Sequence, residues 1–194
     1  MATSTLEIPA PVSTKFCYDH VDKFSVEKFA LTQYSSRFTA KYSEERTLFQ
    51  IEHKKTNHRN STYTVCDSME RPLVQVSKKL GEWRPTWEAI RANGDQQPVF
   101  VMKKSNLNPL NKNFDVFLGT NISMSRPDFT IKRDFFSNNY TICYKDKPIA
   151  QATQQRNFMR TLFNVIIQPG VDRAFITSLV VIFIIKITEN DPLK

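Results

Sequence analysis

Residues 164–187 read NVIIQPGVDRAFITSLVVIFIIKI and contain the longest apolar run of the chain, residues 174–185. Two hydroxyl residues alone interrupt this run, so a helix formed by it has no polar face and must be buried on every side. Asp172, directly after a Pro-Gly-Val turn, can cap such a helix because its carboxylate accepts the free backbone N–H groups of the first turn. The run is shorter than the roughly 20 residues that span a bilayer. We therefore predict a core helix, with a long strand over the Val- and Ile-rich residues 180–187 as the alternative.

Most of the remaining chain consists of short segments in which apolar and polar residues alternate, a pattern typical of half-buried strands. Phe129 and Ile131 share one face of such a segment, and Tyr140, Ile142 and Tyr144 share one face of another. About twelve segments separated by turn-forming residues predict a mainly β fold, an antiparallel barrel or sandwich. The candidate strands are residues 24–31, 34–42, 46–53, 63–67, 73–79, 83–91, 99–104, 114–118, 127–134, 138–144, 148–153 and 162–168.

Two of the predicted hairpins resemble each other. Residues 64–76 and 141–152 both run from a Thr-x-Cys triplet through a turn into a strand that proline opens. Proline is tolerated at the first residue of a strand because its missing N–H costs little there. The similarity indicates either two related halves or two ordinary hairpins with similar turn chemistry.

The chain has an ordinary globular composition with a basic balance, 27 Lys and Arg against 19 Asp and Glu. Such an excess favours acidic partners, namely phosphoinositide headgroups, anionic membrane surfaces or nucleic acid, and it also simply keeps a protein soluble. Three widely separated cysteines without a C-x-x-C pair indicate free thiols in a reducing compartment. Residues 1–15 lack the pattern of a signal peptide. We therefore expect a cytoplasmic protein, with a peripheral membrane location or the nucleus as alternatives.

Basic residues recur in pairs near the predicted ends of strands, where neighbouring strands can gather them into one patch. On a barrel rim, Arg can bind phosphate in bidentate fashion and Lys can act as a point charge. The alternative interpretation is a scatter of solvated charges. The candidate lipid- or anion-binding residues are Lys54, Lys55, Lys78, Lys79, Arg84, Lys103, Lys104, Lys132 and Arg133.

Other kinds of site have little support in the sequence. His53 and His58 flank a basic loop whose positive charges repel a cation, so we expect no metal site. The chain shows neither a Gly-rich phosphate loop nor a Cys–His nucleophile pattern, and we expect no cofactor and no enzymatic activity. Trp83 and Trp87 lie four residues apart in a predicted strand and hence on one face. This spacing favours core packing of both over stacking on bases or insertion into a membrane interface.

The combination of many strands with a buried C-terminal helix resembles the tubby C-terminal-like fold, in its LURP-one-related branch, which is related to phospholipid scramblases. The strongest similarity is residues 168–182, QPGVDRAFITSLVVI, which resemble the segment that opens and forms the central helix of that family. The resemblance implies a closed barrel of about twelve antiparallel strands enclosing the hydrophobic C-terminal helix.

Weaker similarities extend the resemblance over most of the chain. Residues 66–73, CDSMERPL, are similar to the family's D-x-x-G-x-P-L turn, and residues 144–151, YKDKPIAQ, are similar to a second family hairpin. Where the family usually has glycine, this chain has Glu70 or Arg71 in the first turn and Lys147 in the second, so these turns need either left-handed geometry at a non-glycine residue or another turn type. Residues 87–88 and 98–104 resemble two of its strands.

The resemblance defines one domain over residues 21–188, with a flexible N-terminal tail over residues 1–20 and a C-terminal tail over residues 189–194. It implies a non-enzymatic binding or signalling module that engages anionic phospholipid headgroups or a protein partner through its basic exterior. The alternative is a scramblase-like membrane-associated protein whose C-terminal helix contacts the bilayer. We expect a monomer without a transmembrane span, and we do not expect a nucleic-acid partner because no DNA-binding motif accompanies the charge.

Overall fold

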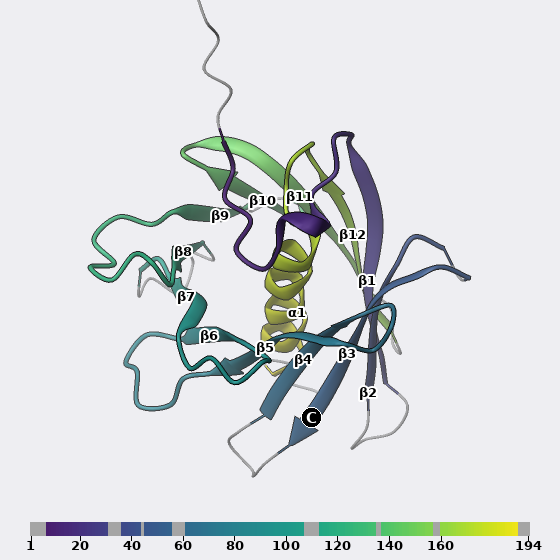
Figure 1. The fold of residues 1–194 in the computed structure, drawn as a ribbon, viewed down its shortest axis with the longest axis horizontal. Coiled ribbons are helices and arrows are strands. Elements are labelled where there is room, and N and C mark those ends of the chain that lie inside the picture. The colour runs from purple at the N-terminus through teal and green to yellow at the C-terminus, as the bar shows by residue number, and fades with distance from the viewer. Residues whose placement is uncertain are drawn as a thin grey trace, which may run out of the picture.

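The computed structural model describes residues 7–30, 36–43, 45–55, 61–106, 113–134, 137–156 and 160–189. Within these residues twelve strands form one closed barrel around the helix α1 (Arg173–Glu189), as Figure 1 shows. The strands are β1 (Asp22–Ala30), β2 (Ser36–Lys41), β3 (Thr47–Lys55), β4 (Ser61–Asp67), β5 (Pro72–Lys78), β6 (Thr86–Arg91), β7 (Pro98–Lys104), β8 (Phe114–Leu118), β9 (Phe129–Arg133), β10 (Asn139–Tyr144), β11 (Lys147–Arg156) and β12 (Arg160–Ile167).

Each strand pairs with its neighbours in the chain, and β1 closes the barrel by pairing with β12. All pairs are antiparallel. The strands coincide with the twelve predicted segments, with ends shifted by a few residues. The predicted alternation is confirmed in β9, where Phe129 and Ile131 are fully buried and Lys132 is exposed. The fold is therefore the closed antiparallel barrel that the sequence and its resemblance predicted.

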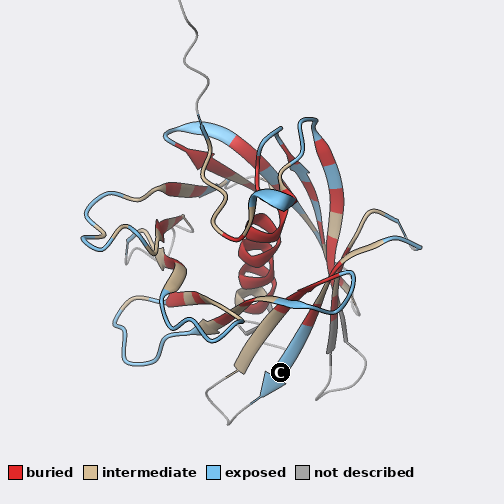
Figure 2. Ribbon diagram, viewed as in Figure 1, coloured by how far each residue is buried: buried red, intermediate tan, exposed pale blue. Residues whose placement is uncertain are grey.

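The helix α1 fills the interior of the barrel, where it is buried along most of its length (Figure 2). Every side chain from residue 174 to residue 185 is buried. Phe175 packs edge-on against Phe100 of β7, and Phe183 stacks on Tyr140 of β10 with ring centroids 4.6 Å apart. The run is thus a core helix, and the alternative of a strand over residues 180–187 is wrong.

Because the barrel encloses residues 174–185, their side chains have no face that could contact a bilayer in this structure. Among the residues with described structure, no helix combines the length and hydrophobicity needed to cross a membrane.

Asp172 caps α1 as predicted. Its Oδ1 accepts hydrogen bonds from the backbone N–H groups of Ala174 at 3.0 Å and Phe175 at 3.1 Å. Its Oδ2 accepts two more, from Val12 at 2.8 Å and Ser13 at 2.9 Å. One carboxylate therefore begins the helix and also fixes a segment that lies far away in the sequence.

That segment, residues 7–20, covers the end of the barrel where α1 begins (Figure 1). It contains the short 3-10 helix η1 (Thr14–Phe16), and its side chains Val12 and Phe16 belong to the core. Arg91 of β6 fixes the segment by donating hydrogen bonds to the backbone oxygens of Pro11 and Val12. The predicted tail over residues 1–20 thus differs from the structure over residues 7–20, while residues 1–6 and 190–194 lie outside the described part. The domain boundaries stay a prediction.

The two similar hairpins share the same local geometry. In both, the strand register shifts just before the cysteine, which leaves Cys66 opposite Pro72 and Cys143 opposite Pro148. The expected left-handed geometry at non-glycine residues is also present. Glu70 has φ of 61° in the first turn, and the second turn uses Lys145 and Asp146, with φ of 47° and 65°, respectively.

The strained turn at Glu70 gives a stability prediction. Left-handed geometry costs a non-glycine residue about 1–2 kcal/mol, part of which glycine loses again through its greater freedom in the unfolded chain. We expect Glu70→Gly to raise the free energy of unfolding by about 0.5–1 kcal/mol in urea titrations. Glu70→Ala keeps the strain and should give no increase, and equal gains in both variants would contradict the backbone explanation.

Candidate functional site

The antiparallel topology brings the predicted basic residues to one end of the barrel. Because neighbouring strands alternate in direction, all odd-numbered strands end where α1 ends, and basic pairs occupy the ends of β3, β5, β7 and β9. Arg84 lies at the same end, in the connection between β5 and β6. We call this set the basic rim; it consists of Lys54, Lys55, Lys78, Lys79, Arg84, Lys103, Lys104, Lys132 and Arg133.

Each basic pair that lies within a strand is divided between the two faces of that strand, because successive side chains point in opposite directions. Lys78, Lys104 and Arg133 each stand opposite a buried aromatic residue of the next strand, so they belong to the inner face and surround the mouth of the barrel. The remaining members in strands lie on the outer wall or beside the mouth. The basic rim can therefore meet an extended anionic surface both on its outer edge and around its opening.

A surface hollow of about 370 Å³ lies on the basic rim between β4, β5 and the start of β6. Three hydroxyl residues, Ser61, Thr62 and Ser77, line it together with Lys78 and Lys79. Ser77 stands directly opposite Thr62 in the sheet. Hydroxyl and ammonium groups both donate hydrogen bonds, which suits the oxygen atoms of a phosphate group. Sequence reasoning missed these hydroxyl residues, because isolated Ser and Thr residues occur in most strands of the chain.

A carboxylate also lines the hollow. Glu88 of β6 accepts a hydrogen bond from Lys79 at 3.3 Å, and both side chains are partly exposed. An ion pair of this kind contributes about 0–1 kcal/mol, so a multivalent anion can compete with Glu88 for the lysine. The hollow is thus suited to an anion that offers more than one negative charge.

The connection between β5 and β6 differs from its prediction. Trp87 is buried at 2% exposure, as predicted, but Trp83 is 79% exposed and lies before the strand, which starts at Thr86. The prediction that both indoles pack in the core is therefore wrong for Trp83. Pro85 stands between the two tryptophans, and its preference for the first position of a strand was the available signal.

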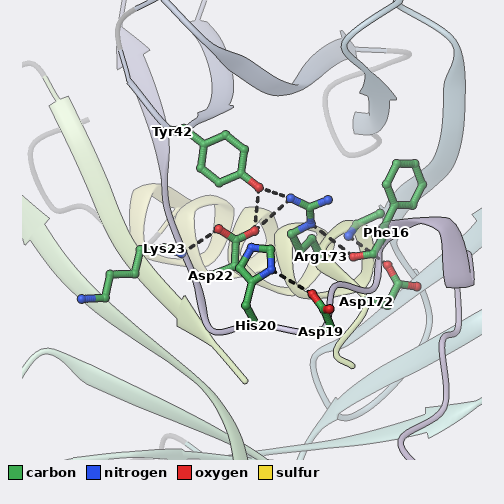
Figure 3. Close-up of polar contacts among 9 residues, drawn as sticks. Phe16, Asp19, His20, Asp22, Lys23, Tyr42, Asp172 and Arg173 are labelled. Atoms are coloured by element: carbon green, nitrogen blue, oxygen red, sulfur yellow. Dashed lines mark hydrogen bonds and ion pairs between the residues drawn. The ribbon is translucent and has the colours of Figure 1, made fainter. Parts of the chain in front are cut away.

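At the opposite end, the charges of a buried cluster are satisfied by the chain itself (Figure 3). Arg173 is 2% exposed and donates to the carboxylate of Asp22 at 2.9 Å and to the backbone oxygen of Phe16 at 3.2 Å. The hydroxyl of Tyr42 lies between them, accepting from Arg173 and donating to Asp22 at 2.6 Å. The guanidinium also lies over the ring of Tyr18, 3.5 Å from its centroid. This cluster joins the N-terminal segment, β1, β2 and α1, and it accounts for Arg173 structurally.

Burial acts on both charged residues at the start of α1. It lowers the pKa of Arg173, which Tyr18 and Asp22 counteract, and it raises the pKa of Asp172, which the four backbone N–H groups counteract. At the same end, the carboxylate of Asp67 accepts hydrogen bonds from Arg71 Nε at 2.9 Å and Arg71 Nη2 at 2.7 Å. Arg173 and Arg71 at this end are thus each paired with a carboxylate.

The histidine pair considered for metal binding is only partly described. His53 stacks on Tyr63 with ring centroids 4.5 Å apart, and burial together with Lys28 and Lys55 lowers its pKa. His58 lies outside the described residues. Over the part of the chain that is described, no group of three or more His, Cys, Asp or Glu residues is placed to hold a metal ion.

The fold places the protein in one structural class, the closed antiparallel barrels that are filled by their own C-terminal helix. In this protein the basic rim lies at the end of the barrel where that helix ends. A family model described as LURP-one-related matches residues 23–184. The chain belongs to the LURP-one-related family.

Several relatives from Arabidopsis thaliana carry that family name. Protein LURP-one-related 15 is 31% identical over 127 residues, which cover 61% of this chain and 58% of the relative. Protein LURP-one-related 13 is 31% identical over 123 residues, covering 61% and 64%, respectively. Protein LURP-one-related 1 is 22% identical over 188 residues, covering 89% and 81%. The aligned part of the chain thus spans less than two thirds of the first two relatives.

Proposed function

We propose that the protein is a non-enzymatic binding module that recognises anionic phospholipid headgroups, phosphoinositides among them, through the basic rim. The observation that carries this proposal is the gathering of basic strand ends at one end of the barrel, beside a hollow lined with hydroxyl and ammonium groups. The side chains of α1 occupy the interior, so the proposed ligand binds on the outside.

The distribution of charge supports a surface ligand. Basic residues near an anionic membrane contribute about 1 kcal/mol each, an attraction that falls off within a Debye length of about 8 Å at physiological salt. Lysines at the ends of β3, β5, β7 and β9 can act on the same membrane together. Arg71 and Arg173 at the other end are instead held by Asp67 and Asp22. The proposed orientation therefore places the end of α1, and not its start, toward the lipid.

The test is co-sedimentation of the protein with vesicles of phosphatidylcholine alone or with phosphatidylserine or a phosphoinositide added. We expect salt-sensitive binding to the anionic vesicles only. Reversing Lys78, Lys79, Lys103 and Lys104 to glutamate should weaken binding by on the order of 100- to 1,000-fold, since four contributions of about 1 kcal/mol are lost. A soluble inositol phosphate that releases the bound protein would show that the headgroup is what is recognised.

A matched control changes the same net charge at the opposite end. The exposed residues Lys23, Arg126, Lys145 and Lys147 lie there, and reversing all four to glutamate should leave vesicle binding within about threefold of wild type. Circular dichroism and urea titration confirm that both variants fold. Equal losses in the two variants would contradict a localised patch, and failure of the wild type to bind any anionic vesicle would overturn the proposal.

A further inference from the structure

We propose that the connection between β5 and β6, residues 79–85, inserts Trp83 and Leu80 into the interface of an anionic bilayer while the neighbouring cations contact the headgroups. This inference rests on the proposed function, because the basic rim brings the bilayer to the connection. It adds an apolar contact with the bilayer, which the charge-reversal variants do not test.

The exposure of two large apolar side chains is the first observation. Trp83 is 79% exposed and Leu80 is 54% exposed. Among the described residues, they are the large hydrophobic side chains exposed at the end of the barrel that carries the basic rim. Tryptophan has an apolar body and a polar N–H, and it is enriched where membrane meets water. Their position is therefore suited to the boundary between headgroups and acyl chains.

Backbone hydrogen bonds fix both ends of the connection, whereas its middle, residues 80–83, is exposed. The backbone N–H of Lys79 donates to Thr86 at 3.0 Å, and the N–H of Lys104 in β7 donates to Pro85 at 3.2 Å. Between these fixed points Gly81 turns the chain with φ of 81°, a geometry that suits glycine. The ends are thus pinned to two strands, and residues 80–83 are exposed beyond them.

Charge surrounds the two apolar side chains. Within residues 78–85, three cations accompany one carboxylate, Glu82. The guanidinium of Arg84 lies 5.9 Å from the centre of the Trp83 ring, so the indole and a phosphate-binding group move toward a membrane together. Leu80 lines the hollow together with Lys78 and Lys79, and Trp83 follows three residues later in the same connection. A lipid whose headgroup occupies the hollow would place the start of its acyl chains close to the connection that carries Leu80 and Trp83.

The opposite end also exposes apolar side chains, which serve as a comparison. Met69 is 71% exposed and Ile122 is 90% exposed, each at the tip of a separate connection. Asp67 binds Arg71 beside Met69, and Asp128 accepts from Asn121 beside Ile122. Neither tip carries a net positive charge, since residues 67–71 hold two carboxylates and one arginine and residues 119–128 hold one of each, so charge complementarity selects the connection that carries Trp83.

The chain has two tryptophans, so its own fluorescence can test the insertion. Trp87 is 2% exposed in the core, and a change caused by vesicles therefore reports on Trp83. With vesicles of phosphatidylcholine and phosphoinositide, we expect the emission of the full chain to shift to shorter wavelength. It should be quenched when the phosphatidylcholine carries brominated acyl chains. Trp83→Ala should show neither effect and should bind the same vesicles about tenfold more weakly.

Ile122→Ala is the matched control, since it removes a more exposed apolar side chain at the other end, and it should bind as the wild type does. Co-sedimentation of the same samples separates the possible failures. Wild-type binding without quenching, or unchanged binding by Trp83→Ala, would overturn the insertion and leave the headgroup proposal standing. Quenching that persists in Trp83→Ala would also overturn it. No binding by the wild type would overturn both proposals.

Discussion

Val180→Asp is expected to prevent the chain from reaching its folded state. Val180 lies in the middle of α1 with no exposure to solvent, surrounded by the inner faces of the strands. A carboxyl group placed there has neither water nor a charged partner, whether it remains ionised or takes up a proton. We expect a loss of more than about 5 kcal/mol, which is comparable to the whole stability of a typical domain.

The measurement is soluble yield together with circular dichroism and, where protein is recovered, urea titration. Val21→Asp is the control, since Val21 is 48% exposed just before β1 and the same change should alter stability by less than about 0.5 kcal/mol. A Val180→Asp protein that unfolds at the wild-type urea concentration would contradict a filled barrel.

Asp172→Ala is expected to produce the second largest effect, a loss of about 3–5 kcal/mol. The change removes the acceptor of four backbone N–H groups, two in the first turn of α1 and two at Val12 and Ser13. A buried N–H without a partner costs about 1–3 kcal/mol, although some of the four gain water when the N-terminal segment loosens. Hydrogen exchange should therefore accelerate in residues 7–20 as well as at the start of the helix.

Two further variants sharpen this result. Asp172→Asn keeps one acceptor oxygen and should lose about half as much stability, because either the helix or the N-terminal segment remains capped. Asp19→Ala removes a carboxylate that is fully exposed in the same region and should leave the stability unchanged. Faster exchange confined to the helix, with residues 7–20 unchanged, would contradict the double role of Asp172.

The architecture was predictable because its determinants are local. The apolar run after Asp172 identifies a buried helix by itself, and alternation such as that of Phe129 and Ile131 identifies a strand from a few residues. Resemblance to a family then supplied what local patterns leave open, the choice between barrel and sandwich. For the left-handed turns, the resemblance pointed to Glu70 or Arg71 in the first hairpin, and Glu70 has that geometry; in the second it pointed to Lys147, whereas Lys145 and Asp146 have it.

The N-terminal segment could not be predicted, because its order depends on distant partners. Val12 and Phe16 are isolated apolar residues in a polar stretch with two prolines, a composition typical of a tail. Their burial follows from contacts with Asp172 and Arg91, which belong to elements formed much later in the chain. A single sequence contains no pattern that links such positions.

The candidate site was predictable in composition and not in shape. Basic pairs at strand ends are visible in the sequence. Their location at one end of the barrel depends on the direction of the strands, which alternates without interruption from β3 to β9. The exposure of Trp83 depends on where β6 starts, and strand boundaries are the least certain part of a sequence-based assignment. The hollow beside Lys78 depends on three hydroxyl residues of two strands, which become meaningful only in register.

The order of the elements, with α1 after all twelve strands, has a consequence for biosynthesis. A ribosome releases all twelve strands before it releases the helix that they enclose, and the partner of β1 is the last strand made. Until then the inward-facing aromatic residues have no core to enter, and pairing across almost the whole chain is slow. The barrel therefore cannot close around its core until β12 and α1 have both been made.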